Sequence, residues 1–325
     1  MKFTSIPENG STWSDKLIYG IDTEKSEPIH LVVDIVDVDR DTTLGRCRLY
    51  NVTNAEVNIA PYLRSRDNFR QVGSCTPMAF ISPASRNIAV VVNGNVSPSR
   101  LFFRVPLDCS KAHTLSTITT TQTLSLGEPI RLTVFSRDGL RVTVEYSSAT
   151  RYLGTIIVEE GSYGNPIEVI IPTVMYPKET ERIKLLIQDA EENVLQRITY
   201  CIVERAPSAR RLMWYNKLGG VECYTFPTSV RTRYKACGAR SSSVEGQPVD
   251  MLSREEHYRL ISAHEVEAEM NRIAEIVFSP KLYELRGEDI IELELASREI
   301  LFDRQGALRQ LAIDVCEKER GGVVC

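Results

Sequence analysis

The sequence has few of the features that mark a metalloprotein or a disulfide-rich protein. Its eight cysteines are scattered and form no Cys-x-x-Cys pair, which excludes the common zinc patterns and a dense disulfide framework. No two of its four histidines have the spacing of metal ligands on one helix. We therefore expect no metal, no cofactor, and thiols that stay reduced as in a cytosolic protein.

Catalytic motifs are missing as well. The sequence contains no G-x-S-x-G nucleophile elbow and no H-E-x-x-H helix. Gly219-Gly220 is not followed by the Lys-Ser or Lys-Thr of a phosphate-binding loop. We therefore do not expect an enzyme. A glycosidase remains open as a weaker alternative, because its two carboxylates leave little trace in a sequence.

Long apolar runs and a strong charge of one sign are also absent. No run approaches the roughly 18 apolar residues of a membrane-spanning helix, so we expect no membrane span. The first residues, MKFTSIPENGSTWSD, lack the apolar centre of a secretory signal peptide, and we expect synthesis in the cytoplasm without one. A net charge of −4 argues against a nucleic-acid partner held by a basic face.

What the sequence does contain, over its first two-thirds, is a succession of short β-type segments. Residues 29–38 are rich in β-branched residues, and their second half alternates, with Asp34 and Asp37 assigned to the polar side. Asn93-Gly94 predicts a tight turn. The strands predicted in this first unit are 29–38, 45–51, 55–61, 87–92 and 101–105.

A second β unit follows, with turns every 8–12 residues or so, as in immunoglobulin-like sandwiches. Asp138-Gly139 predicts a hairpin turn between two of its strands. The Cys…Trp…Cys mark of true immunoglobulin domains is absent, since Trp13 and Trp214 both lie outside the unit. The predicted strands are 114–124, 130–136, 141–147, 152–158, 166–171, 182–188 and 195–204.

An acidic cluster in the first unit has the beginning of a calcium-binding loop. Asp37, Asp39 and Asp41 have the spacing with which an EF-hand loop starts. That loop needs Gly at its sixth position and Glu at its twelfth, where this sequence has Thr42 and Arg48. We therefore interpret the acids as a solvated strand end and turn.

The last third of the chain is predicted to be a linker followed by a small α+β unit. Residues 227–252 are rich in Arg, Ser and Gly and favour a linker or a loop that becomes ordered on assembly. Ser253-x-x-Glu256 is a capping box, which predicts a helix from there to about Phe278. Strands are predicted at 290–295 and 311–315. The apolar face of the predicted helix consists of Val266, Met270, Ile273 and Val277.

Between these units lies the aromatic stretch 210–226, RRLMWYNKLGGVECYTF, in a basic region whose single acid is Glu222. Its Gly-Gly turn predicts a hairpin. The aromatic side chains belong either to the core, as large apolar residues usually do, or to an assembly interface, because Trp, Tyr and Arg dominate interface energetics. Both interpretations hold if one face of the hairpin packs inward and the other binds a partner. The candidate interface residues are Arg210, Arg211, Trp214, Tyr215, Asn216, Gly219, Gly220, Tyr224 and Phe226.

Taken together, the segments predict a mainly β protein. It has two consecutive β-sandwich-like domains, then an aromatic hairpin with its linker, then a small α+β C-terminal unit. The predicted boundaries are 1–106, 107–204, 205–252 and 253–325.

Three stretches also carry a resemblance to a known group. They are 3–7 with 57–64, then 106–135, then 214–226 with 278–281. On these stretches the chain resembles tail-associated virion structural proteins of tailed phages and prophages of Bacteroidetes bacteria. The resemblance implies a virion protein whose partners are copies of itself, in a symmetric ring or trimer, and other virion structural proteins. It implies no catalytic residues.

The leading hypothesis is therefore a structural component of a phage or phage-derived particle, in the tail or baseplate region. One alternative is a receptor- or glycan-binding module built on β-sandwiches, for which Tyr152 and Tyr163 are candidate aromatic contacts. A cell-wall or glycan hydrolase is the third hypothesis.

Overall fold

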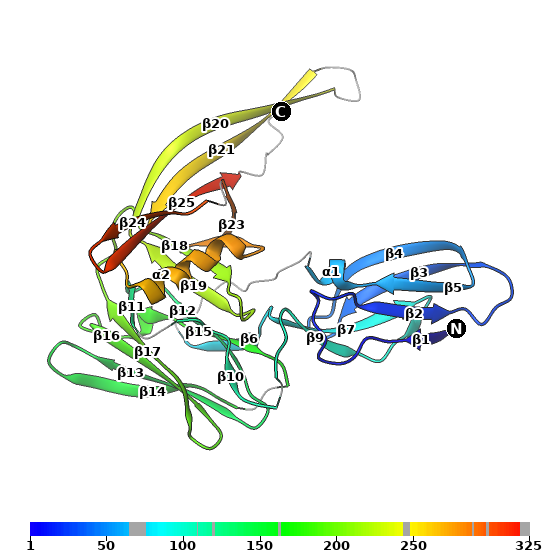
Figure 1. Ribbon diagram of the computed structural model, residues 1–325, viewed down its shortest axis with the longest axis horizontal. Coiled ribbons are helices and arrows are strands. Elements are labelled where there is room, and N and C mark those ends of the chain that lie inside the picture. Colours follow the sequence, from blue (N-terminus) through cyan, green and yellow to red (C-terminus); the bar gives the residue numbers. More distant parts are fainter. Residues whose placement is uncertain are drawn as a thin grey trace.

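A computed structural model describes residues 1–64, 76–108, 110–118, 121–161, 164–242, 248–287, 289–296 and 299–318, with backbone alone for the parts of 234–254 among them and for 318. The chain forms three lobes (Figure 1): the N-terminal lobe in blue and cyan, the middle lobe mainly in green, and the C-terminal lobe from yellow-green to red. The fold is mainly β, as predicted. In the described ranges, no helix combines the length and apolar character needed to cross a bilayer.

The N-terminal lobe is a sandwich of two antiparallel sheets, with orders β1-β2-β5 and β4-β3-β7-β8, and β9 also on β7. Alternate residues of β3, such as Leu31 and Val33, fill the core between them. Asn93 and Gly94 have positive φ and turn β7 into β8, which confirms the predicted turn. The elements are β1 (Lys2–Ser5), β2 (Ile18–Asp22), β3 (Ile29–Asp37), β4 (Thr42–Val52), β5 (Asn54–Asn58), α1 (Ala60–Arg64), β7 (Ser85–Val92), β8 (Asn95–Val96) and β9 (Arg100–Phe103).

Asp37 does not lie where the sequence pattern placed it. Asp34 and Asp37 are three residues apart, so they point to opposite faces of β3 and cannot share a polar side. Asp37 is fully buried, and its Oδ2 accepts hydrogen bonds from Arg86 at 3.0 Å and from Arg40 at 2.9 Å. The prediction of a solvated strand end is therefore wrong for Asp37, whose carboxylate compensates the buried guanidinium of Arg86.

The middle lobe is a second sandwich, with sheet orders β10-β12-β15-β6 and β11-β17-β16-β13-β14. Most predicted strands coincide with observed ones, and the predicted segment 114–124 contains two. Its core consists of inward-facing Val, Ile and Leu from both sheets. The elements are β10 (His113–Thr114), β11 (Thr121–Leu124), β12 (Ile130–Phe135), β13 (Leu140–Ser147), β14 (Tyr152–Gly161), β15 (Ile167–Ile171), η1 (Thr173–Met175), β16 (Arg182–Asp189) and β17 (Val194–Ile202).

Two predictions about this lobe need correction. Asp138-Gly139 does not join a hairpin: β12 pairs with β10 and β15, whereas β13 pairs with β14 and β16 in the other sheet. The boundary at 106 also fails to separate the lobes. Strand β6 (Met78–Ile81) comes from the first predicted domain and pairs antiparallel with β15 of the second. Local alternation specifies a strand but not its partner.

The C-terminal lobe is one curved antiparallel sheet of order β19-β18-β22-β23-β25-β21-β20, with β24 on β25, and helix α2 packs against it (Figure 1). Met270 and Ile273 of the helix are fully buried in its core. The elements are β18 (Arg210–Tyr215), β19 (Val221–Phe226), β20 (Thr228–Ser242), β21 (Pro248–Ile261), α2 (Glu267–Ala274), η2 (Glu275–Phe278), β22 (Leu282–Arg286), β23 (Asp289–Leu295), β24 (Leu301–Gln305) and β25 (Leu308–Lys318).

The linker predicted at 227–252 and the helix predicted from Ser253 are both wrong. Residues 228–242 and 248–261 form the long antiparallel pair β20–β21, and the helix begins only at Glu267. Tyr258 and Leu260 are buried while Arg259 between them is half-buried, a period of two that belongs to a strand. A capping box contributes about 1 kcal/mol, which extended pairing on both sides of β21 outweighs.

Candidate functional site

The predicted aromatic hairpin is present. Strands β18 and β19 pair from Arg210↔Phe226 to Tyr215↔Val221. Asn216 Oδ1 accepts hydrogen bonds from the backbone N–H groups of Leu218 and Gly220, and Gly219 has a φ of +79°, a conformation that favours glycine. The Gly-Gly pair thus makes the turn that the sequence indicated.

Both faces of this hairpin are covered by the same chain. Trp214 and Phe226 are fully buried in the core that contains α2, and Tyr224 joins them at 4% exposure. Tyr215, on the opposite face, is 2% exposed. The aromatic side chains are therefore core in this chain. An assembly interface made of them would need surface that they do not have, so an interface must be sought elsewhere.

The polar members of the predicted set tie the hairpin to the middle lobe. Arg211 donates one hydrogen bond to Thr225 and another, at 3.1 Å, to the carbonyl of Pro129. Asn216 Nδ2 donates to the carbonyl of Leu115 at 2.8 Å. A Cβ on Gly220 would lie 1.9 Å from that same carbonyl oxygen, so only glycine permits this approach.

Arg210 makes its contacts within the C-terminal lobe. Its guanidinium lies 3.6 Å from the ring centroid of Tyr258 and 3.5 Å from Glu284 Oε2. This cation–π and ion-pair arrangement holds β18 to its own sheet. Of the predicted residues, Arg211, Asn216 and Gly220 therefore form the junction with the middle lobe, whereas Arg210 stays within the C-terminal lobe.

A buried ionic cluster completes the junction. Arg272 of α2 donates to Glu222 Oε2 of β19 at 3.0 Å and to Glu269 Oε1 at 3.0 Å. All three side chains are at most 3% exposed. Asn216 and Gln122 add hydrogen bonds to the two carboxylates. The cluster spans α2, the hairpin and the middle lobe, and the single acid of the basic region is part of it.

The chemistry of this cluster is structural. Burial alone would lower the pKa of Arg272, but the charges of Glu222 and Glu269 outweigh it and raise the pKa. The guanidinium therefore stays charged, and each carboxylate is held by several donors. Removing one partner would leave an uncompensated charge in the interior.

A cavity of about 670 Å³ lies where the N-terminal lobe meets the C-terminal lobe. Trp13, Tyr215 and Phe278 contribute aromatic rings to it, and the Arg104 guanidinium lies 3.6 Å from the Tyr215 ring centroid. Its acid, Glu275, forms an ion pair with Lys217 at 2.9 Å. Among the described residues that line the cavity, Glu275 is the one acid, and the aromatic rings suit an aromatic or apolar group.

The strand pair β20–β21 extends beyond the sheet (Figure 1). Strand β21 pairs with β25 only from Glu255 to Ile261. Among the described residues, the pairs from Ala236↔Arg254 to Ser242↔Pro248 have no third strand beside them. We call this part, residues 236–242 and 248–254, the ribbon. A two-stranded ribbon is marginally stable alone, and both of its edges carry backbone groups that can accept another strand.

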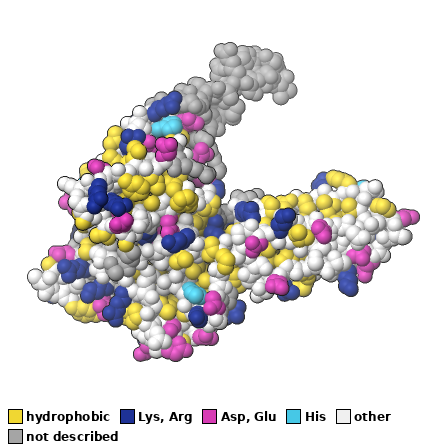
Figure 2. Space-filling view, in the orientation of Figure 1, with side chains coloured by type: hydrophobic (Ala, Val, Ile, Leu, Met, Phe, Trp, Pro, Cys, Tyr) yellow, Lys and Arg dark blue, Asp and Glu magenta, His cyan; other side chains and the backbone are white. Residues whose placement is uncertain are grey.

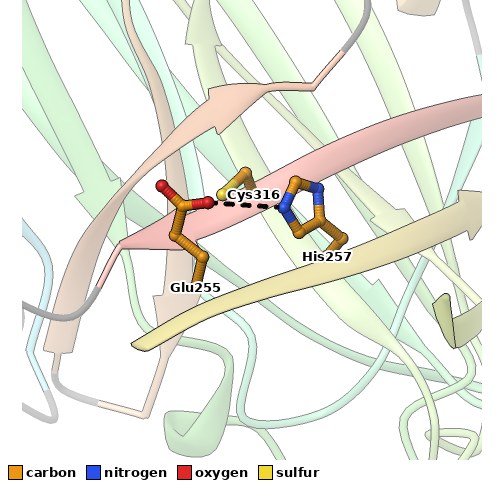
Figure 3. A group of neighbouring side chains, drawn as sticks. All are labelled: Glu255, His257 and Cys316. Atoms are coloured by element: carbon orange, nitrogen blue, oxygen red, sulfur yellow. Dashed lines mark ion pairs between the residues drawn. The ribbon is translucent and has the colours of Figure 1, made fainter. Parts of the chain in front are cut away.

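The structure also brings together a group that sequence reasoning missed. Glu255, His257 and Cys316 place their ligand atoms within 4.8 Å of one another (Figure 3). The helix predicted from Ser253 included His257, whereas His257 lies on β21, directly opposite Cys316 of β25. Only the register between two distant strands reveals this group, so no local signal could have found it.

Comparison with known proteins adds no family to this description. No protein-family model matches the sequence, and no curated protein matches it either.

Proposed function

We propose that the chain is a structural component of a phage or phage-derived particle, in the tail or baseplate region, and acts through protein–protein assembly contacts. The observation that carries the proposal is the ribbon. It presents two strands without a third neighbour among the described residues, on a body whose own hairpin and helix are tightly buried. The resemblance of the three sequence stretches to tail-associated virion proteins supplies the kind of particle.

The partner that fits the ribbon best is another copy of this chain. Strand addition uses backbone hydrogen bonds and needs an unpaired edge on the partner. In the middle lobe, β14 lies at the end of its sheet, and β13 is the one strand paired with it among the described residues. Tyr152 and Ile157 on β14 are 63% and 55% exposed. A ribbon that meets β14 of the next copy makes a heterologous contact, which closes into a ring or trimer.

The surface charge supports contacts between proteins. On the face drawn in Figure 2, basic and acidic side chains of the described residues are interspersed over the lobes. A nucleic-acid partner would favour a uniformly basic face. A mixed surface favours protein partners, here further copies and other virion structural proteins.

The first experiment locates the chain in particles. Density-banded particles from an induced culture of the source are analysed by peptide mass spectrometry and immunogold microscopy. Abundant peptides and gold at one end of the tail are expected. If cells contain the chain and banded particles lack it, the virion proposal fails.

A ribbon deletion tests the mode of assembly. Residues 237–253 are replaced by Asn-Gly, which joins the register partners Ala236 and Arg254 through a tight turn. The wild type should oligomerise in light scattering and enter particles, whereas the deletion variant should be monomeric with an unchanged unfolding temperature. Val174→Ser, at a side chain 57% exposed in the middle lobe, is the control and should assemble normally. Equal assembly of wild type and deletion variant would exclude the ribbon.

The cavity favours a second candidate, a receptor- or glycan-binding module. Phe278 on its wall is 85% exposed and offers an aromatic face, whereas Trp13 and Tyr215 line the cavity at 3% and 2% exposure. Of the aromatic contacts predicted from sequence, Tyr152 lies on β14 away from the cavity lining, and Tyr163 lies outside the described residues. Glycan-array binding that Phe278→Ala abolishes without affecting oligomerisation would favour this function. Array binding unaffected by that substitution would exclude the cavity.

A further inference from the structure

The group at the base of the ribbon has the geometry of a metal site. His257 and Cys316 are register partners on β21 and β25, and Glu255 lies two residues before His257 on the same face. His257 Nε2 and Glu255 Oε2 are 3.7 Å apart, and all three ligand atoms lie within 4.8 Å of one another. Figure 3 shows the three side chains converging from the two strands. Cys316 is 5% exposed, and the other two are half-buried.

We propose that Glu255, His257 and Cys316 bind one divalent transition-metal ion, with zinc as the preferred ion. Zinc bonds of about 2.0 to 2.3 Å at tetrahedral angles place neighbouring ligand atoms roughly 3.3 to 3.8 Å apart. The His257–Glu255 distance already meets this, and small rotations about side-chain bonds bring the sulfur into place. Thiolate with imidazole selects zinc over magnesium or calcium. Three protein ligands leave the fourth position to water.

The charges around the group suit a divalent cation. A thiolate at Cys316 and the carboxylate of Glu255 together balance the two positive charges of the ion. Glu294 of β23 is the register partner of Cys316 on its other side, and cross-strand partners share a face. Among the neighbouring cations, Arg259 is held by a bidentate pair with Asp314, both hydrogen bonds being 2.9 Å.

The position of the site gives it a structural consequence. Glu255 is the first residue of β21 that pairs with β25, next to the ribbon. An ion held by Glu255 and Cys316 therefore joins the two strands where the ribbon leaves the sheet. Metal binding to a folded site stabilises the elements that supply its ligands. This inference concerns the single chain and stands whether or not the ribbon assembles with another copy.

Cobalt substitution tests the proposal directly. The full-length chain is reduced, freed of metal with a chelator, and titrated with Co²⁺. We expect one equivalent to bind with visible tetrahedral bands and a near-ultraviolet thiolate-to-cobalt charge-transfer band, which Zn²⁺ abolishes by displacement. Cys316→Ser should remove the charge-transfer band, and His257→Ala should weaken Zn²⁺ binding by more than about tenfold.

Matched substitutions separate metal binding from general damage. Cys47→Ser alters a cysteine of the N-terminal lobe, and His264→Ala alters an exposed histidine after β21, so both should bind as the wild type does. Cys316→His keeps a donor and should retain Zn²⁺ while losing the charge-transfer band. If the wild type shows no such band at one equivalent, or if Cys316→Ser keeps it, the site is refuted.

Discussion

Two antiparallel strand pairs follow one another in this chain, and they differ in burial. The aromatic hairpin β18–β19 is covered on both faces by its own chain, with Trp214 fully buried. The next pair, β20–β21, begins in the same sheet and continues beyond it as the ribbon. The hairpin with the composition of an interface is interior, and the segment with the composition of a linker projects outward.

A composition typical of interfaces therefore does not specify whether the contact is made within one chain or with a second chain. Trp, Tyr and Arg provide large contact area and strong polar anchors at any tightly packed boundary. In this chain the boundary lies between two lobes, where Arg211 reaches the carbonyl of Pro129 and Asn216 reaches that of Leu115. The ribbon has no such side-chain signature, because strand addition depends on backbone groups.

The largest expected effect that separates the two hairpins is on stability. Trp214→Ala removes a fully buried indole from the C-terminal core and should reduce the free energy of unfolding by about 3 to 5 kcal/mol. Val230→Ala on β20, where the side chain is 50% exposed, should change it by less than about 0.5 kcal/mol. Urea unfolding followed by far-ultraviolet circular dichroism, which does not depend on the removed tryptophan, measures the free energy of unfolding of both variants. Equal effects would abolish the contrast.

The next effect sharpens the role of the ionic cluster that anchors the aromatic hairpin. Arg272→Met leaves the buried carboxylates of Glu222 and Glu269 without their cation and should cost about 3 kcal/mol. Arg141→Met breaks the exposed pair with Glu160 and should change the unfolding temperature little, because solvent screens an exposed ion pair. Thermal unfolding of both variants provides the test; a loss for Arg272→Met no larger than the control's would mean that the cluster adds nothing.

The smallest expected effect is a pH dependence at the edge of the same core. Burial raises the pKa of Glu265, whose Oε1 accepts a hydrogen bond from Tyr224 at 3.0 Å. The pKa of Glu265 is higher in the folded state than in the unfolded state. Protonated Glu265 therefore contributes fully to the free energy of unfolding below the unfolded-state pKa, and this contribution is lost as pH rises through the folded-state pKa. Glu265→Gln should therefore gain stability relative to the wild type as pH rises through this range.

Urea unfolding of both proteins at a series of pH values from the acid side of that transition to neutrality measures the difference. Tyr224→Phe provides the control, since the Tyr224 hydrogen bond lowers the pKa of Glu265. Without the hydroxyl, the transition should move to higher pH. A difference between wild type and Glu265→Gln that does not vary with pH would contradict the prediction.

The strands of the sandwiches could be predicted because their signal is local. Alternation and β-branched residues identified β12 through β17, and Asn93-Gly94 identified its turn. Pairing could not be predicted in the same way. Asp138-Gly139 connects two sheets instead of two neighbours, since a turn dipeptide specifies a change of direction and leaves the partner open.

The candidate site shows the same division. The turn at Gly219-Gly220 was visible in the sequence, whereas burial of the hairpin depends on α2 and on the middle lobe, which are distant in the sequence. The capping box at Ser253 predicted a helix where pairing along β20 and β25 imposes a strand. The group of His257 and Cys316 follows from that pairing and was invisible for the same reason.

The strand that crosses from the first lobe into the second has a consequence for synthesis. Strand β6 (Met78–Ile81) leaves the ribosome well before β15 (Ile167–Ile171), the strand it pairs with. The first sandwich can fold early during synthesis, but β6 stays unpaired until β15 of the second sandwich has been synthesised. A gene shortened to begin at residue 107 would encode a sandwich without β6. The buried strand β15 would then become an exposed sheet edge that favours aggregation.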